Sequence, residues 1–135
     1  AGLLREALAG LAGYDLVLLD CPPNLYLLSW AAMLAADHVV VPVPPEDFGA
    51  QGLRAVHQAV AHAAVLNPRL RLTGHLVTRC DGRLAVHRAY ARKLRALYPD
   101  TVFATTVPEA AAFKVALSCR QPVSHCLPRS RAAQA

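Results

Sequence analysis

The sequence predicts an α/β domain of three layers, in which a mostly parallel β-sheet has helices on both faces. Two observations lead to this fold class. Apolar runs without polar alternation, such as Leu16–Leu19, are typical of strands that are buried on both faces. Such runs alternate with segments of helical periodicity four times along the chain, and this order favours right-handed crossovers between parallel strands.

The expected elements follow one another over most of the chain. The expected strands are residues 16–19, 38–43, 71–78 and 101–107, and the expected helices are residues 3–11, 25–36, 48–66, 86–98 and 109–117. Gly13 is expected to end the first helix, and Asn67-Pro68 the longest one. The tail, residues 118–135, contains prolines and arginines and is expected to be irregular. A chain of 135 residues is expected to form a single domain, residues 1–135.

The composition excludes several classes of protein. With 55% hydrophobic and 17% charged residues, the chain is too apolar for a disordered tail. Its longest apolar stretch, Leu25–Ala36, is interrupted by Ser29 and is shorter than the roughly 20 residues of a membrane-spanning helix. No membrane association is therefore expected. The four cysteines lack Cys-x-x-Cys spacing, so we expect no zinc site or disulfide framework, and reduced thiols in the cytoplasm are the simplest interpretation.

Positive charge is concentrated in one part of the chain. The net charge is +5, and between Arg69 and Arg95 the only acidic residue is Asp81. Three of the arginines in this stretch, Arg88, Arg92 and Arg95, recur on one face of an expected helix. Such a cluster is typical of a surface that contacts a polyanion, and the alternative is a solvated helix face.

Two aspartates follow expected strands. Asp20 comes directly after Leu16–Leu19, and an apolar run closed by a carboxylate is the Walker B pattern, in which the carboxylate orders a magnesium ion beside nucleotide phosphates. The alternative is an aspartate that caps the next turn. For Asp81, capping of the following helix is the first interpretation, and orientation of Arg83 is the second.

Spaced motifs from Tyr14 to Gln134 extend the Walker B pattern. In the first half they are Asp20-Cys21-Pro22-Pro23, Ala35-Ala36-Asp37, Pro42-Val43, Glu46 and Gln51-Gly52-Leu53. In the second half they are Thr78–Arg83, Thr106-Val107-Pro108, Pro122-Val123 and Pro128–Ala133. Together these motifs resemble the ParA/MinD family of deviant Walker ATPases, and the second half resembles its ParA branch. This family acts in plasmid and chromosome partition and in the placement of the division site.

The resemblance implies a partial P-loop NTPase-like fold and a function in plasmid or chromosome segregation. It implies Mg-ATP-dependent homodimerisation, non-specific DNA binding and ATP hydrolysis stimulated by a ParB-like centromere-binding protein, in the cytoplasm and at the nucleoid. Asp20 would be the magnesium-side carboxylate, acting through water. Pro108, Glu109 and Ala110 would form the adenine region. Arg83, together with Arg88, Arg92 and Arg95, would face DNA.

The resemblance covers only the C-terminal half of a family member. The family's glycine loop, K-G-G-x-G-K-T/S, holds the phosphates through backbone N–H groups, and arginine side chains do not replace such donors. No G-x-x-x-x-G-K occurs in this sequence, and both lysines, Lys93 and Lys114, lie in expected helices. We therefore expect that the chain alone does not hydrolyse ATP.

The last third of the chain departs further from the family pattern. Glu109-Ala110 stands where ParA proteins have arginine and asparagine, and Arg120-Gln121 stands where they have glycine and lysine. Other departures are Asn24 and Tyr26 for small residues, Ala112 for a basic residue, and Val115-Ala116-Leu117 for Glu-Ala-Pro. These changes weaken the expected contacts with the base and indicate a relaxed nucleotide site.

Two other interpretations remain open. The chain is a non-catalytic, truncated module for DNA binding or dimer interaction, or it is one half of a split ATPase whose P-loop half is a separate polypeptide. A K-G-G-x-G-K-T motif in the upstream reading frame would distinguish these interpretations. Because the P-loop strand lies in the middle of the family's sheet, the chain alone is expected to self-associate through exposed edges and apolar faces.

Overall fold

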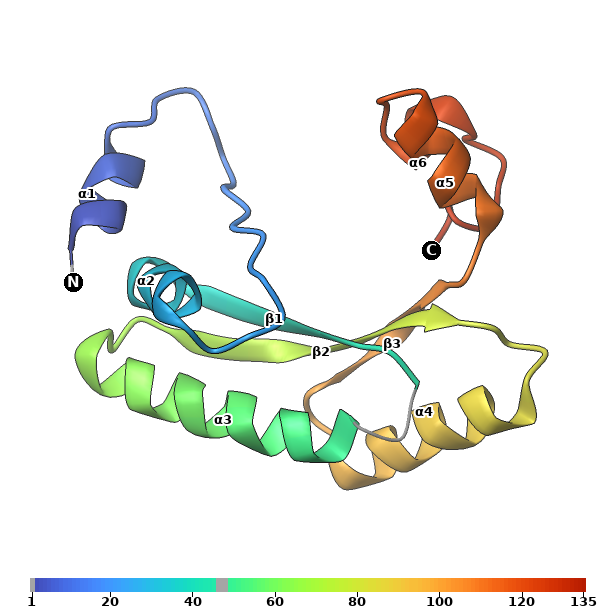
Figure 1. Cartoon of the computed structure of the whole chain (residues 1–135), viewed down its shortest axis with the longest axis horizontal. Coiled ribbons are helices and arrows are strands. Elements are labelled where there is room, and N and C mark those ends of the chain that lie inside the picture. The colour runs from blue at the N-terminus through green and yellow to red at the C-terminus, as the bar shows by residue number, and fades with distance from the viewer. Residues whose placement is uncertain (1, 46–48) are drawn as a thin grey trace. The chain divides into compact units, whose positions relative to one another are not determined.

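The computed structural model describes residues 2–45 and 49–135, and within them it contains a three-stranded sheet. Glu46 and Phe48, which belong to the expected motif and helix, lie outside the described residues. The strands are β1 (His38–Val43), β2 (Arg71–Cys80) and β3 (Val102–Pro108), in the order β1-β2-β3 (Figure 1). The helices are α1 (Leu3–Ala9), α2 (Leu27–Ala35), α3 (Gly49–Leu66), α4 (Ala85–Leu97), α5 (Ala111–Ser118) and α6 (Val123–Cys126).

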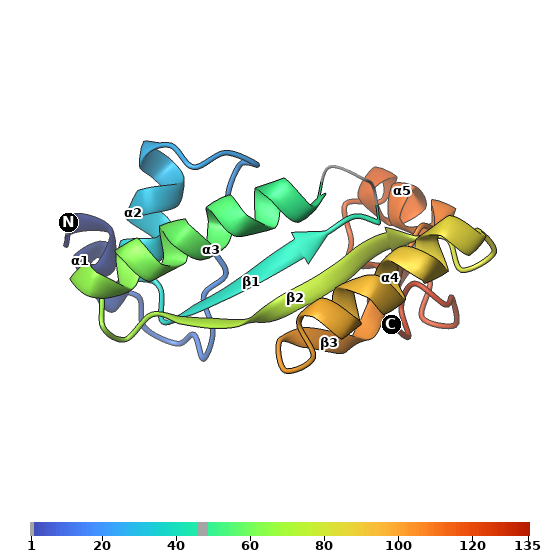
Figure 2. The same cartoon turned by 90° about the horizontal axis from the view of Figure 1, so that it is seen from below.

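The sheet confirms the predicted α/β class. β2 and β3 pair in parallel, with His75 opposite Val102 and Cys80 opposite Pro108. The arrows of β1 and β2 also run in the same direction (Figure 2). Each pair of consecutive strands is joined through a helix, α3 or α4, as parallel neighbours require.

The expected first strand is wrong. Residues 16–19 form no strand, and Leu16 and Leu18 are exposed, although the elements expected after them are present within a few residues of their predicted bounds. A strand needs neighbours that pair with its N–H and C=O groups, and the described residues provide none beside this segment. Its apolar composition therefore does not make it a strand here.

The chain divides into two compact units, and the first consists of Ala1–Val39 and Ala50–Thr73. In this unit α2 and α3 lie on opposite sides of the strands (Figure 1). Its buried core is made by Met33, Ala59, Val60, Ala63 and Leu70, with Trp30 and Leu72 packed against them. The helices on both faces that the fold class predicts are thus present in this unit.

Polar contacts close one end of the first unit. Asp37 accepts hydrogen bonds from Arg5 of α1 at 3.3 Å and from Arg69 at 3.1 Å. Asn67, which follows α3, is buried and donates its side-chain amide to the carbonyl oxygens at the end of α2. These bonds supply donors to carbonyls that a helix end leaves without intrahelical partners.

The second unit consists of Val40–Gly49 and Gly74–Ala135. Its two paired strands approach closely at one point, because the N–H of His75 donates to the carbonyl oxygen of Thr101 at 2.6 Å. The His75 side chain is fully buried, with Nδ1 3.2 Å from Thr101 Oγ1 and its ring 5.3 Å from the ring of Tyr98. A side chain at the preceding Gly74 would meet the Thr101 carbonyl oxygen at 2.5 Å.

The segment after Ser118, which was expected to be irregular, contains one short helix. It contains α6, a single helical turn, and a well-formed end to α5. There the N–H groups of Arg120 and Gln121 donate to the carbonyls of Leu117 and Ala116 at 3.0 and 3.1 Å, which is the Schellman arrangement. Arg120 has φ 51°, in the left-handed region that usually holds glycine, and the sequence resemblance has glycine at this position.

None of the helices in the described part of the chain has the length and apolarity needed to cross a bilayer.

Candidate functional site

The carboxyl ends of β2 and β3 lie side by side in the second unit. In parallel sheets ligands bind beyond these ends, so the loops that begin at Asp81 and Glu109 are the candidate site. The N–H of Glu109 donates to the carbonyl oxygen of Cys80 at 3.2 Å, and Arg79 Nε donates to Glu109 Oε2 at 3.1 Å. The loop after β3 is therefore tied to the end of β2.

The ion pair between Arg79 and Glu109 was not predicted from the sequence. Glu109 was expected only as an altered residue of the adenine region, together with Pro108 and Ala110. The sequence indicated this ion pair only indirectly, because Arg79 and Glu109 lie at the ends of two expected strands. Arg79 adopts φ 53°, so the local backbone is also in an unusual conformation for a residue with a side chain.

The loop after β2 orients Arg83. Its Nε donates to Asp81 Oδ1 at 3.0 Å and its Nη2 to Asp81 Oδ2 at 2.8 Å, while its backbone N–H also reaches Oδ1. These hydrogen bonds with Arg83 lower the pKa of Asp81 to about 2. The N-cap of α4 is Leu84, so the first interpretation of Asp81, as the cap of that helix, is wrong and the second holds.

Arg88 joins Arg83 at this loop. Its Nη1 donates to the carbonyl oxygens of Gly82 and Arg83 at 2.7 and 2.9 Å, so the guanidinium folds back from α4. The Arg83 side chain nevertheless remains 90% exposed. Two guanidinium groups are thus held at one short loop with access to solvent.

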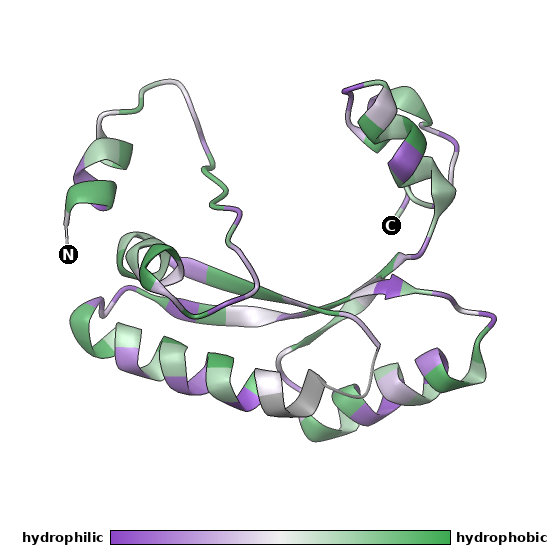
Figure 3. Cartoon of the chain, in the orientation of Figure 1, coloured by the Kyte–Doolittle hydropathy of each residue, from purple (hydrophilic) through white to green (hydrophobic). Residues whose placement is uncertain are grey.

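The other two predicted arginines of α4 are placed differently. Arg92 is exposed, and no partner for it is recorded within residues 2–45 and 49–135. Arg95 Nη2 lies 3.1 Å from both the Ala104 carbonyl oxygen and Thr106 Oγ1, so it is bound to β3. Hydrophilic and hydrophobic positions alternate along α4 (Figure 3).

Asp20 lies in the first unit, in the unpaired segment, and is exposed. Magnesium sites in nucleotide enzymes combine one or two carboxylates with phosphate oxygens and water. Among the described residues no group of three or more histidine, cysteine, aspartate or glutamate side chains is placed to hold a metal ion. The role of Asp20 as the magnesium-side carboxylate therefore stays a prediction.

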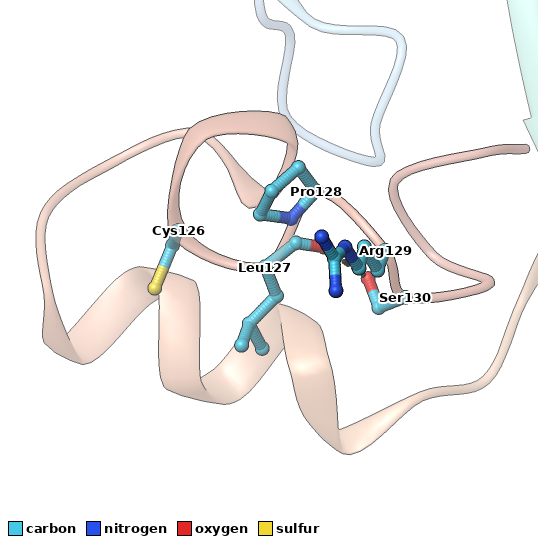
Figure 4. A pocket seen from close by; sticks show the side chains of 5 residues that line it. All are labelled: Cys126, Leu127, Pro128, Arg129 and Ser130. Carbon is cyan, nitrogen blue, oxygen red and sulfur yellow. Dashed lines mark hydrogen bonds between the residues drawn. The ribbon is translucent and has the colours of Figure 1, made fainter.

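Two shallow pockets, one in each unit, are lined by none of the predicted site residues. One, of about 220 Å³, is lined by Cys126, Leu127, Pro128, Arg129 and Ser130 (Figure 4). The other, of about 280 Å³, is lined by Gly2, Arg5, Leu34, Leu66, Asn67, Pro68 and Arg69. Both are smaller than the usual ligand pocket, which begins at about 300 Å³.

Comparison with known proteins identifies relatives for almost the whole chain. Residues 3–72 match the family described as AAA domain. The chain is 41% identical to the chromosome-partitioning ATPase Soj of Thermus thermophilus, over 98% of this chain and 53% of that protein. It is 36% identical to the chromosome partitioning protein ParA of Caulobacter vibrioides, over 89% of this chain and 46% of that protein.

Solved structures agree with the fold. Cobyrinic acid a,c-diamide synthase from Mycobacterium smegmatis superposes with a TM-score of 0.78 and 28% identity, covering 99% of this chain and 49% of that one. The same synthase with bound ADP and magnesium gives 0.73 at 32% identity, over 82% and 47%. The chain thus spans about half the length of the relatives that it matches.

Proposed function

This chain belongs to the ParA/MinD family of deviant Walker ATPases, and from that membership we propose that it is the DNA-contacting part of a partition ATPase. Its relatives are named as chromosome-partitioning proteins. We assign it the same process, segregation of a chromosome or plasmid, at the nucleoid in the cytoplasm. Homodimerisation and a ParB-like centromere-binding partner belong to the proposal.

The observation that favours DNA contact is the pair of guanidinium groups held at one loop. Asp81 and the loop carbonyls bind one side of Arg83 and Arg88, which reduces the conformational freedom that each loses on binding phosphate. Arg92, exposed on the following helix, adds a third cation. Contacts with DNA phosphates need charge and reach rather than base readout, so the proposed binding is non-specific. Arg95 has a smaller part in this proposal, because β3 already binds it.

The experiment measures binding of the full chain to random-sequence duplex DNA by fluorescence anisotropy over a range of salt concentrations. We expect affinity to fall as salt rises, and Arg83→Ala, Arg88→Ala and Arg92→Ala each to weaken binding several-fold and to reduce the salt slope by about 1. Arg54→Ala removes the same charge from exposed Arg54 of α3 and should have a smaller effect. Equal effects of all four substitutions, or no binding at low salt, would refute the assignment.

For nucleotide, we propose that Asp20 and the loop from Pro108 to Ala110 act only together with a phosphate loop from elsewhere in the ATPase. The support is that the sequence has no G-x-x-x-x-G-K and spans about half of its relatives. ADP and magnesium are bound by the related synthase. In the complete site the ion would be held on its protein side by Asp20 through water, and would supply charge compensation for the phosphates.

Binding of labelled ATP in the presence of magnesium tests whether the chain needs a separate phosphate loop to bind nucleotide. The chain alone should not bind measurably, whereas a version joined to a relative's phosphate-loop half should bind and hydrolyse ATP, and Asp20→Ala should abolish that hydrolysis. Tight, Asp20-dependent binding by the chain alone would mean that phosphates are held without a glycine loop, and the proposal for the nucleotide would fail.

A further inference from the structure

The turn between β2 and α4, residues 81–84, is anchored through Asp81. The backbone N–H of Asp81 donates to Nδ1 of His87 at 3.0 Å, and the Asp81 carbonyl oxygen accepts the N–H of Leu84 at 3.1 Å. Both backbone polar groups of Asp81 are therefore bound. Because the Asp81 carboxylate holds Arg83, the position of the backbone at Asp81 decides where the Arg83 guanidinium lies.

His87 is the third residue of α4, and both His87 and Asp81 are half-buried. A side chain at this position of a helix can reach back to a backbone N–H at the start of the helix, as glutamate does in a capping box. Leu84, the N-cap residue of α4, makes no side-chain hydrogen bond to the helix. His87 thus supplies, from inside the helix, a side-chain bond to the turn that the N-cap residue does not supply.

The direction of this hydrogen bond fixes the state of the His87 ring. A backbone N–H only donates, so Nδ1 of His87 accepts and carries no hydrogen, and the hydrogen of the neutral imidazole is on Nε2. An imidazole protonated on both nitrogens could not accept this bond. In the structure His87 therefore acts as an acceptor and adds no positive charge to the surface that carries Arg83 and Arg88.

We propose that His87 is a positioning residue for the DNA contact, because it binds the backbone of Asp81 and thereby places the carboxylate that orients Arg83. The inference rests on the proposed function of Arg83, and His87 itself makes no phosphate contact in it. Loss of the His87 acceptor takes away the partner of the Asp81 N–H and lets the turn adopt several conformations. Arg83 must then lose more conformational freedom when it binds phosphate.

The first measurement is the affinity of the full chain for random-sequence duplex DNA over a range of salt concentrations. His87→Leu keeps a side chain of similar size but removes the acceptor. It should weaken binding several-fold with an unchanged salt slope, because no cation is lost. His87→Asn should restore most of the affinity, because its Oδ1 is as far along the side chain as Nδ1 and accepts the same bond. His62→Leu, at an exposed histidine of α3, is the matched control and should have no effect.

The second measurement follows the turn without DNA. Hydrogen exchange of the Asp81 amide, read by NMR, should be several-fold faster in His87→Leu than in the unmodified chain, and slow again in His87→Asn. Long-range proton–nitrogen spectra should show a hydrogen on Nε2 of His87 and none on Nδ1. Equal exchange in His87→Leu, a hydrogen on Nδ1, or a His87→Asn chain that binds DNA as weakly as His87→Leu would each overturn the inference.

A double variant separates this inference from the proposed function. His87→Leu should weaken DNA binding much less in an Arg83→Ala chain than in the unmodified chain, because the side chain that His87 positions is then absent. If Arg83→Ala weakens binding and His87→Leu does not, or if the two effects simply add, the inference fails and the proposed function stands. If Arg83→Ala has no effect, the proposed function of Arg83 fails and the inference fails with it.

Discussion

The side-chain amide nitrogen of Asn67 lies 2.7 Å from the carbonyl oxygen of Ala36 and joins the end of α3 to the end of α2. The same amide nitrogen donates to the Met33 carbonyl oxygen at 3.0 Å. The side-chain oxygen of Asn67, Oδ1, accepts a hydrogen bond from Arg5 Nη2 at 3.3 Å. Asn67 is buried, so water does not readily replace these bonds.

We expect Asn67→Ala to lower the free energy of unfolding by about 2 kcal/mol, because it removes the side-chain donor from the buried bond to the Met33 carbonyl and one of the two side-chain donors to the Ala36 carbonyl, to which Arg5 Nη2 still donates. Urea denaturation followed by circular dichroism measures the change. Gln58→Ala, which removes an exposed amide from α3, should alter stability by less than about 0.5 kcal/mol. Equal effects of the two substitutions would show that the Asn67 bonds contribute little.

Gly74→Ala should destabilise the second unit by roughly 1–3 kcal/mol or more, because the new Cβ would lie 2.5 Å from the backbone oxygen of Thr101. Removal of this steric clash requires β2 and β3 to move apart. Gly52→Ala is the matched control, since, apart from the backbone of α3 itself, no atom in the described part of the chain lies within 4 Å of a Cβ at this position. It should stabilise the chain by up to about 1 kcal/mol, because alanine favours a helix interior. Thermal unfolding that ranks the two variants in the opposite order would contradict the close approach at Gly74.

Arg120→Gly should raise stability by about 0.5–1 kcal/mol, because glycine adopts φ 51° without the steric penalty of a Cβ. Thermal melting of the reduced chain provides the measurement. Arg129→Gly removes an equal charge from the same region but gains no such relief, and it should not stabilise. Stabilisation by both variants would assign the effect to charge instead of backbone conformation.

The ion pair between Asp81 and Arg83 predicts a pH dependence. Folding depresses the pKa of Asp81 from 3.8 to about 2, so its stabilising contribution is present above pH 3.8 and is lost as the pH falls through about 2. Titration of the Asp81 carboxyl carbon by NMR should give a midpoint near the lower value. In Arg83→Ala the midpoint should move toward 3.8, and stability should fall less steeply over this acid range. An unchanged midpoint would mean that Arg83 does not hold the carboxylate.

We expect the isolated chain to self-associate through exposed apolar side chains. Leu18 and Leu27 of the first unit are 83% and 80% exposed, and Leu16 and Leu28 are also exposed. Monomeric proteins rarely leave large apolar areas in water, so light scattering should detect oligomers at micromolar concentration. Leu18→Lys and Leu27→Lys should reduce the mean mass, whereas Gln58→Lys should not. A monodisperse monomer that melts cooperatively would refute the prediction.

Much of the fold followed from local pattern. The helical spacing of Leu53, Val56 and Val60 predicted α3, and Asn67-Pro68 predicted its end. The apolar runs before Pro44 and Pro108 predicted β1 and β3. These features succeed because periodicity, proline and glycine act on the backbone within one element.

The candidate site was less predictable, because its contacts join residues from different elements. The sequence placed Arg83, Arg88, Arg92 and Arg95 in one cluster, but the structure binds Arg95 to β3 and folds Arg88 onto the loop of Arg83. The ion pair between Arg79 and Glu109 was not predicted, because the sequence shows only that both residues lie at strand ends and not that they are in contact. Contact of the four arginines in that cluster with DNA stays a prediction.

The sequence by itself determined the α/β class, the order of most elements and the family, because apolar period and spaced motifs are properties of the chain alone. Tertiary structure decided which apolar run is a strand and which charged groups are already bound. Leu16–Leu19 has the composition of a buried strand but remains unpaired, since a strand exists only beside a partner. Arg95 has the spacing of a surface cation but bonds to Ala104, since a hydrogen bond depends on what folding brings within reach.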